Sequence, residues 1–248
     1  MSEVLLDVRN MELRYGAAVA VRGVSFTVSR GQFVAVIGNN GAGKSSMMRG
    51  VTGLVRPSGG QVFFCGDDTT RLTADRKVAS GLVMVPEGRL LFPDQTVRDN
   101  LVLGAYLRGG LRDGTSRTTL ENVLELFPRL SERLHQLAGS MSGGEQQMLA
   151  IARGLMARPE LLIIDELSLG LAPKIIDQLM ATLGTLNREG LTILLVEQLA
   201  SHALAIASHA LVMSNGRITH RGLSPELVHA PEVMEAFLGK KKASSNPT

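Results

Sequence analysis

The stretch QFVAVIGNNGAGKSSMMRGVT, residues 32–52, decides the fold. It begins with a short apolar strand over 32–37, continues through a glycine-rich loop and ends in a helical segment over 44–52. The loop fits the pattern GxxxxGK[ST] with Gly38, Asn39, Asn40, Gly41, Ala42, Gly43, Lys44 and Ser45, and Ser46 follows it. Such glycines let backbone N–H groups turn inward around phosphate oxygens, where the helix N-terminus adds its positive dipole end. We therefore expect residues 38–46 to bind a nucleotide, with Lys44 reaching the β and γ phosphates.

A pair of carboxylates ends a second apolar segment. Four apolar residues over 161–164 lead directly into Asp165 and Glu166. Magnesium is a hard cation that prefers oxygen ligands, so the Ser45 hydroxyl and Asp165 are candidate metal ligands. Glu166 is a candidate general base that polarises an attacking water. The motif together with the phosphate loop predicts nucleotide hydrolysis.

The remaining pattern predicts an α/β architecture. Residues 4–13 and 19–28 alternate apolar and polar positions, as half-buried antiparallel strands do. Residues 82–85, 161–165 and 192–196 are continuous apolar runs, typical of strands buried in a parallel sheet. Residues 97–157 are mostly helical in pattern, with breaks near 109–114 and at Pro128. Part of this region is expected to be an inserted helical lobe.

Composition narrows the class of protein. The 248 residues, 44% of them hydrophobic, suffice for one well-buried domain, and no apolar run approaches the roughly 20 residues that span a bilayer. The first residues lack the pattern of a secretory signal, so the chain is expected to stay in the cytoplasm. The net charge of +3 indicates no nucleic-acid partner. The single cysteine, Cys65, is expected in a buried strand because apolar residues precede it.

A third motif is MSGGEQQ, residues 141–147, which opens another helical segment. Ser142, Gly143 and Gly144 resemble the LSGGQ signature of the ABC ATPases, with Met141 for the usual leucine and Glu145 inserted before glutamine. A serine hydroxyl, two glycines and a helix N-terminus suit a second anion site. From the order and spacing of the three motifs, the chain is identified as a member of this family over about residues 4–239.

The resemblance implies an α/β fold: a P-loop NTPase (RecA-like) core with an N-terminal antiparallel β subdomain and an inserted helical subdomain over about 88–157. It implies a single ABC ATPase domain over 1–239 and a polar, disordered tail over 240–248. ATP and Mg2+ are the implied cofactors, and Tyr15 is the implied adenine-stacking residue. Two ATPase subunits then stack head to tail, so that Ser142 and Gly144 of one copy close over the ATP held by Lys44 of the other.

The resemblance also implies partners and a place in the cell. Two transmembrane permease subunits bind the ATPase pair and hold it on the inner face of the cell membrane, and an external substrate-binding protein acts indirectly. We expect a groove lined by Glu87, Arg89 and the following helical lobe to receive a short permease helix. Since the permeases and the binding protein determine which substrate is transported, no residue of this chain is expected to recognise that substrate.

Several positions depart from the usual family pattern. Glu87 stands where members carry a glutamine that touches magnesium, so it is a candidate metal ligand. Gln198 stands where they carry a histidine that senses the γ phosphate, and is assigned with Glu166 to catalysis. Leu167 and Ala172 replace the usual proline and aspartate. As replacements for the missing histidine we reject His202, His209 and His220, which are expected to be ordinary loop or helix residues.

The departures indicate a subgroup. The runs 85–89, 168–173 and 195–198 resemble the shorter ATP-binding subunit of branched-chain amino acid uptake systems, whereas Leu167, Ser208 and His209 differ from it. An importer of related amino acids, amides or urea remains an alternative. A second alternative is a non-transport ABC ATPase, although such proteins need coiled coils, zinc modules or tandem ATPase units. A third alternative is a regulatory module that holds ATP without turnover.

Overall fold

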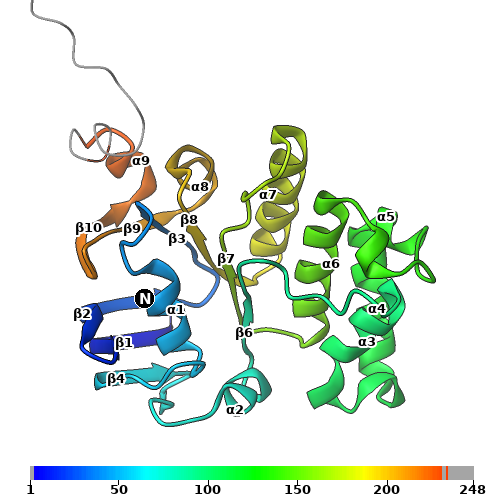
Figure 1. Ribbon diagram of the computed structural model, residues 1–248, viewed down its shortest axis with the longest axis horizontal. Coiled ribbons are helices and arrows are strands. Elements are labelled where there is room, and N and C mark those ends of the chain that lie inside the picture. The colour runs from blue at the N-terminus through cyan, green and yellow to red at the C-terminus, as the bar shows by residue number, and fades with distance from the viewer. Residues whose placement is uncertain (1–2, 231–232, 234–248) are drawn as a thin grey trace, which may run out of the picture.

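Two β-sheets and a group of helices make up the structure, a computed structural model that describes residues 3–230 and 233 (Figure 1). The tail predicted over 240–248 lies outside these residues. The first sheet is antiparallel and has the order β2 (Ala18–Ser29), β1 (Val4–Tyr15), β4 (Gly59–Phe64) and β5 (Asp67–Asp68). The second has the order β10 (Arg217–Leu223), β9 (His209–Ser214), β3 (Phe33–Gly38), β8 (Thr192–Glu197), β7 (Leu161–Asp165) and β6 (Leu82–Val85).

The six-stranded sheet is parallel from β9 to β6, and β10 joins its edge in the antiparallel direction. Every residue of β3, β7 and β8 is buried, as their apolar sequences predicted. Because parallel strands share one direction, the loops that follow β3, β6, β7 and β8 all leave from the same edge. That edge receives the candidate functional residues.

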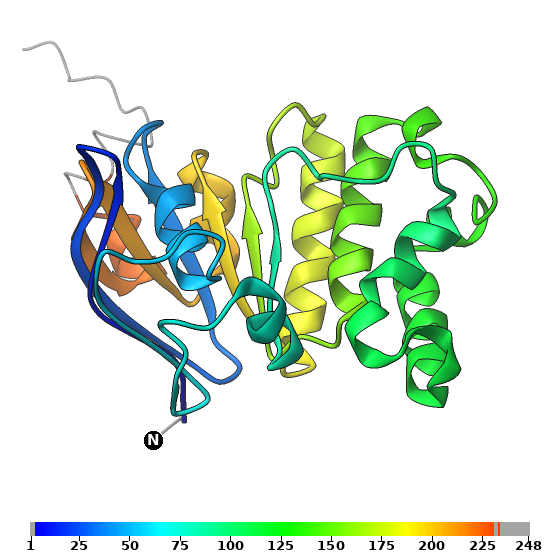
Figure 2. The same ribbon diagram turned by 60° about the horizontal axis from the view of Figure 1, so that its bottom comes forward.

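Two apolar clusters cover the two faces of this sheet. Alternate residues such as Val34 and Val36 pack with the antiparallel sheet and with α1 (Lys44–Val51). The residues between them, such as Ala35 and Ile37, pack with the helices on the other face. Those helices include α6 (Gly143–Met156), α7 (Pro173–Arg188) and α8 (Ala200–Ile206). Figure 2 shows the resulting layers, with the antiparallel sheet on one side and the helices on the other. The α/β fold class is confirmed.

The helical region is more interrupted than the sequence predicted. It contains α3 (Val97–Gly104), η1 (Tyr106–Arg108), η2 (Gly110–Arg112), α4 (Gly114–Leu126), α5 (Pro128–Ser131) and η3 (Ala138–Ser140) before α6. The breaks predicted near 109–114 and at Pro128 are present, but a third separates α5 from α6. The remaining short helices are α2 (Ala74–Ala79) and α9 (Ser224–Leu227).

Two predictions about single residues were wrong. Cys65 is exposed, because β4 ends at Phe64 and the chain turns at Cys65 with φ of 53° to start β5. His209 and His220 lie in strands β9 and β10 rather than in loops or helices, whereas His202 lies in α8.

A buried lysine holds the C-terminal end of α1. The Lys77 side chain, from α2, is fully buried, and its Nζ donates a hydrogen bond to the Val51 carbonyl oxygen at 2.6 Å. A cation at this end of a helix satisfies a carbonyl and complements the helix dipole. Burial lowers the pKa of Lys77 to about 8.

We expect Lys77→Met to remove a pH-dependent part of the stability. The unfolded chain holds the lysine proton more tightly, with an ordinary pKa of 10.5 against about 8 when folded. The free energy of unfolding of the parent therefore rises, through this group, from about pH 8 to about pH 10.5. The variant lacks this rise. Urea unfolding of both chains across this range measures it, and a difference that stays constant with pH would contradict the assignment.

Candidate functional site

A cavity of about 510 Å³ lies at the edge of the parallel sheet where the strands end. The phosphate loop forms one wall with residues 40–46, and Glu87, Glu166 and Gln198 line it from three other loops. The structure thus brings together residues that are far apart in the sequence. Gly38, Asn39 and Asp165 stand directly behind this lining.

The loop backbone is shaped by its glycines. Gly43 has φ of 98° and is the N-cap of α1, and a Cβ at this position would lie 2.6 Å from the Ala20 carbonyl oxygen. Only glycine fits there, since the chain both adopts a left-handed conformation and passes close to β2. The N-terminus of α1 therefore opens into the cavity with its unpaired N–H groups.

Lys44 is held at the floor of the cavity. Only 5% of it is exposed, and its Nζ donates a hydrogen bond to the Gly38 carbonyl oxygen at 2.8 Å. The same Nζ lies 3.3 Å from Glu166 Oε1. A desolvated cation between a backbone carbonyl and a carboxylate is fixed in place, so its charge acts on whatever anion enters the cavity.

Asp165 is buried beside Lys44 and close to two further carboxylates. Ser45 Oγ donates a hydrogen bond to Asp165 Oδ1 at 3.1 Å. The pKa of Asp165 is raised to about 6, chiefly by burial and also by the charges of Glu166 and Glu87, whereas the Ser45 hydrogen bond opposes the shift. A cation at this point would offset the accumulated negative charge. The donor set, a hydroxyl and a buried carboxylate, fits Mg2+, which is commonly bound through one or two carboxylates plus substrate phosphates.

Glu166 has a strained backbone. Its φ is 54°, a left-handed conformation that is uncommon for a residue with a side chain. The Glu166 N–H donates a hydrogen bond to the Val196 carbonyl oxygen at 2.9 Å, which ties this turn to β8. The conformation turns the chain sharply at the end of β7 and leaves the Glu166 carboxylate in the cavity lining.

Part of the cavity lining was not predicted from the sequence. Val19, Ala20 and Arg22 come from β2, and Asn215 and Gly216 from the turn between β9 and β10. The Arg22 N–H donates to the Gly216 carbonyl oxygen at 2.8 Å, which holds the two segments together. No motif marks these residues, because only tertiary pairing brings them to the loop. Tyr15, the predicted adenine contact, is 42% exposed and is not among the lining residues, so its stacking role stays a prediction.

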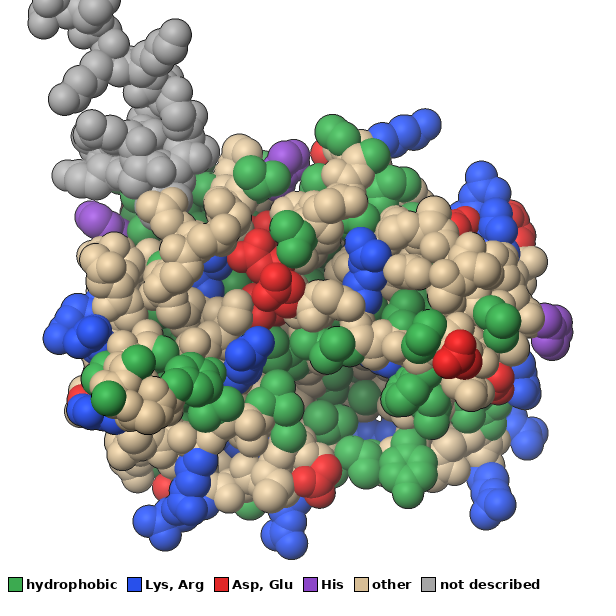
Figure 3. Space-filling view, viewed as in Figure 1, with side chains coloured by type: hydrophobic (Ala, Val, Ile, Leu, Met, Phe, Trp, Pro, Cys, Tyr) green, Lys and Arg blue, Asp and Glu red, His purple; other side chains and the backbone are tan. Residues whose placement is uncertain are grey.

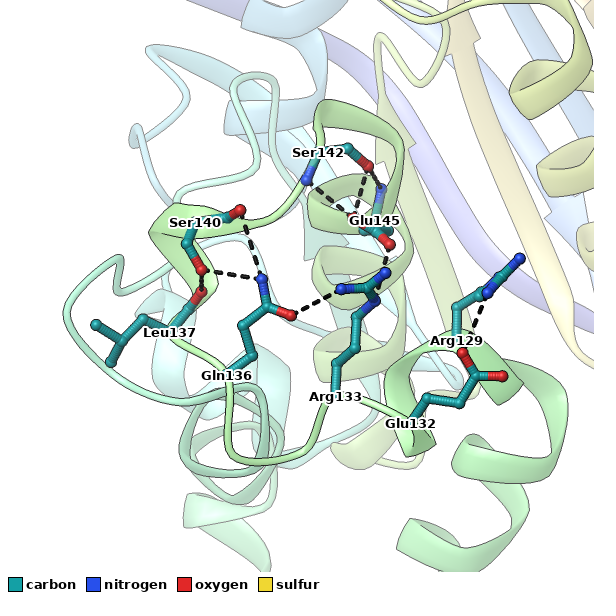
Figure 4. A network of polar contacts seen from close by, with 8 residues as sticks. All are labelled: Arg129, Glu132, Arg133, Gln136, Leu137, Ser140, Ser142 and Glu145. Carbon is teal, nitrogen blue, oxygen red and sulfur yellow. Dashed lines mark hydrogen bonds and ion pairs between the residues drawn. The ribbon is translucent and has the colours of Figure 1, made fainter.

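The third motif lies outside this cavity, at the N-terminus of α6. Ser142 caps the helix: its Oγ accepts from the Glu145 N–H at 3.4 Å, and its own N–H donates to Glu145 Oε2 at 2.9 Å. Gly144 packs so closely on α7 that a Cβ would lie 2.9 Å from Ile175. Figure 4 shows a polar network that continues from Glu145 to Arg133 and on to Gln136 and Ser140.

Arg89 also contacts α6, and its role in a groove for a permease helix stays a prediction. Its Nη1 donates to Gln146 Oε1 at 3.0 Å and its Nε to Gln147 Oε1 at 3.3 Å. Glu87 lines the cavity described above. The chain turns through left-handed conformations at Arg89 and Leu90, which carries the arginine toward the helix.

An α/β core with a glycine-rich loop at a helix N-terminus, facing an Asp–Glu pair, defines a P-loop nucleotide-binding protein. A family model described as "ABC transporter" matches residues 21–168. The chain belongs to the ABC transporter family. Among the described residues, no helix is both long and apolar enough to cross a membrane.

Individual relatives agree with the family. The chain is 42% identical to the high-affinity branched-chain amino acid transport ATP-binding protein BraG of Pseudomonas aeruginosa, over 95% of this chain and 100% of that one. It is 32% identical to the probable branched-chain amino acid transport ATP-binding protein LivF of Archaeoglobus fulgidus, over 87% of this chain and 91% of that one. The structure is similar to the ADP conformation of MJ1267, an ATP-binding cassette of an ABC transporter, with a TM-score of 0.84, 27% identity and coverage of 96% and 100%.

We expect Glu145→Ala to lower the free energy of unfolding by about 1 kcal/mol at neutral pH, since it removes half of a capping box. Hydrogen bonds from Ser142 hold the pKa of Glu145 below its ordinary value of 4.5. This stabilisation is present above the unfolded pKa and is lost as the pH falls through the folded one. Urea unfolding at neutral and acidic pH measures the difference. Glu145→Gln is the matched control, because glutamine also fits a capping box and should cost less; equal losses would argue against capping.

Proposed function

We propose that this chain binds ATP with Mg2+ in the phosphate-loop cavity and hydrolyses it, as the ATP-binding subunit of an importer of branched-chain amino acids. The observation that carries the proposal is the meeting of Lys44, Asp165 and Glu166 at one cavity. The cargo is inferred from the 42% identity to BraG over nearly the whole chain.

Each residue of the cavity has a distinct task in this proposal. The loop N–H groups and Lys44 bind the β and γ phosphates, and because Lys44 is held by the Gly38 carbonyl it stays oriented as the charge develops. Ser45 and Asp165 would hold Mg2+, with Glu87 near it, and the ion would supply positive charge that offsets the charge of the phosphates. Glu166 accepts a proton from the attacking water. Gln198 orients that water through its amide.

The position of the third motif supports action as a pair. Ser142, Gly143 and Gly144 lie at the N-terminus of α6, a position that favours anions, yet they lie outside the chain's own cavity. In a head-to-tail pair, Ser142 and Gly144 of one subunit would close over the ATP bound by the other. Each cavity is then complete only in the presence of a second subunit.

An apolar groove supports binding to a permease. A pocket of about 290 Å³ lies between β6 and the helical lobe, and it is lined by Phe92, Leu103, Tyr106 and Leu107, all of them exposed. Figure 3 shows hydrophobic side chains gathered around a hollow in the lower half of the molecule. Exposed apolar surface of this kind is typical of interaction sites, and a short permease helix would cover it.

We expect Glu166→Gln to bind ATP normally and to lose at least about 100-fold in turnover, since an amide cannot accept the proton. The variant should form a stable dimer with ATP and Mg2+, detected by gel filtration. Lys44→Ala is the comparison, because it should lose ATP binding itself. Turnover by Glu166→Gln at the parental rate would refute its role as base, and ATP binding by Lys44→Ala with parental affinity would refute the phosphate-loop assignment.

We expect Tyr106→Glu to abolish transport while ATP binding by the isolated chain is unchanged. Tyr106 is 75% exposed in the groove, and a charge there would oppose the burial of apolar surface. Co-purification with the permeases and uptake of labelled leucine measure the effect. Leu54→Glu is the matched control, since Leu54 is 57% exposed and lies outside the groove lining. Normal assembly and uptake by Tyr106→Glu would exclude this groove as the permease contact.

A further inference from the structure

A buried carboxylate that has no task in the proposed reaction lies next to the cavity. Glu197 is the last residue of β8 and is fully buried. The Ser168 N–H donates to its Oε1 at 2.9 Å, and the Ser168 hydroxyl donates to its Oε2 at 2.6 Å. No ion pair of Glu197 is formed within the described part of the chain. Its two oxygens are thus satisfied by a single serine.

The sheet pattern calls for an apolar residue at this position. Ile193 and Leu195 precede Glu197 on the same face of β8 and pack into the apolar cluster of α6, α7 and α8. A carboxylate in such a place is costly, and burial raises the pKa of Glu197. Replacing buried charged groups by apolar residues of similar size is often neutral or stabilising, so stability alone does not account for this residue.

The contact closes a short loop that carries reactive groups. The loop leaves β7 at Asp165 and is tied to β8 at two consecutive points, by the Glu166 N–H to the Val196 carbonyl and by Ser168 to Glu197. Between these ties lies the strained backbone of Glu166. Strained conformations persist only where the surroundings hold them, and these two ties are such restraints.

The same contact sits between residues of the cavity wall. Leu169 follows Ser168, Gln198 follows Glu197, and both line the cavity together with Glu166. The buried contact between Ser168 and Glu197 therefore connects the loop after β7 with the start of the loop after β8. Both loops contribute side chains to the cavity lining next to this contact.

We propose that Glu197 is a positioning residue, whose carboxylate anchors Ser168 so that Glu166 and Gln198 keep their orientation toward the reacting phosphate. The inference rests on the proposed function, in which Glu166 is the general base. Displacement of a catalytic group by about 1 Å can cost about 100-fold in rate, so a lost anchor should reduce turnover without weakening binding of ATP.

The test compares Glu197→Leu, Glu197→Gln and Ser168→Ala with the parent chain. Glu197→Leu should lower kcat by at least about 10-fold, with KM for ATP and the urea midpoint little changed. Glu197→Gln should recover most of the rate, because its carbonyl accepts the Ser168 N–H and its amide donates to the Ser168 oxygen. Ser168→Ala, which loses one of the two bonds, should be intermediate. Combined with Glu197→Leu it should cause no further loss.

A second readout reports on the loop without relying on activity. Amide hydrogen exchange over residues 167–171 should become faster in Glu197→Leu, since the loop has lost its anchor. Thr192→Val is the matched control: Thr192 is buried at the other end of β8, and its Oγ1 accepts from the Gly31 N–H at 3.0 Å. That variant also loses a buried hydrogen bond of this strand, but it should keep kcat and loop exchange.

The possible outcomes distinguish failure of the positioning role of Glu197 from failure of the proposed function. If Glu197→Leu keeps the parental kcat and loop exchange while the parent hydrolyses ATP, the positioning role is wrong and the proposed function stands. An equally lowered kcat in Thr192→Val would also overturn the positioning role of Glu197. In that case the loss of any buried hydrogen bond of β8 would be enough to lower kcat. If the parent chain has no ATP turnover, or Glu166→Gln retains it, both proposals fall.

Discussion

Burial of the parallel sheet on both faces is the constraint on which the rest of this structure depends. All residues of β3, β7 and β8 are buried, with one apolar cluster on each side of the sheet. An unpaired charge within such a sheet would be strongly destabilising, so charged side chains can stand only where the strands end. Because these strands are parallel, their carboxyl ends coincide, and Lys44, Asp165 and Glu166 are thereby concentrated at one edge.

This concentration creates a site with opposed charges. Burial raises the pKa of Asp165, and Glu166 and Glu87 are close enough that their charges add to the shift, while Lys44 is held against Glu166. The negative charge around Asp165 is not fully compensated and favours a bound cation. The N-terminus of α1, in contrast, favours a bound anion. A magnesium nucleotide supplies both, since it brings a cation and phosphate oxygens together. The electrostatics of the cavity therefore fit the proposed ligand.

Glu166 and Glu197 both depart from the locally preferred structure at some cost in stability. In both cases the departure places a side chain at or next to the cavity. Glu166 adopts a left-handed backbone, and Glu197 places a carboxylate where Ile193 and Leu195 predict an apolar side chain. Glu166 directly follows β7 and Glu197 is the last residue of β8, so both departures lie where the two loops that line the cavity begin. Departures from local preference are common at functional sites, where position of a side chain matters more than the free energy of the fold.

The sequence by itself determined the parallel core, the phosphate loop and the Asp165–Glu166 pair, because each depends on local order: an apolar strand followed at once by its functional residues. It also identified the family, through the spacing of three motifs. It could not show that Arg22 and Asn215 reach the cavity, that Arg89 turns toward α6, or that Cys65 is exposed. These facts follow from β-pairing and from turns between segments distant in the chain. Likewise, Glu197 appears in the sequence only as a charge at a strand end. Its contact with Ser168 exists because β7 and β8 are neighbours in the sheet, and only the tertiary structure decides which strands are neighbours.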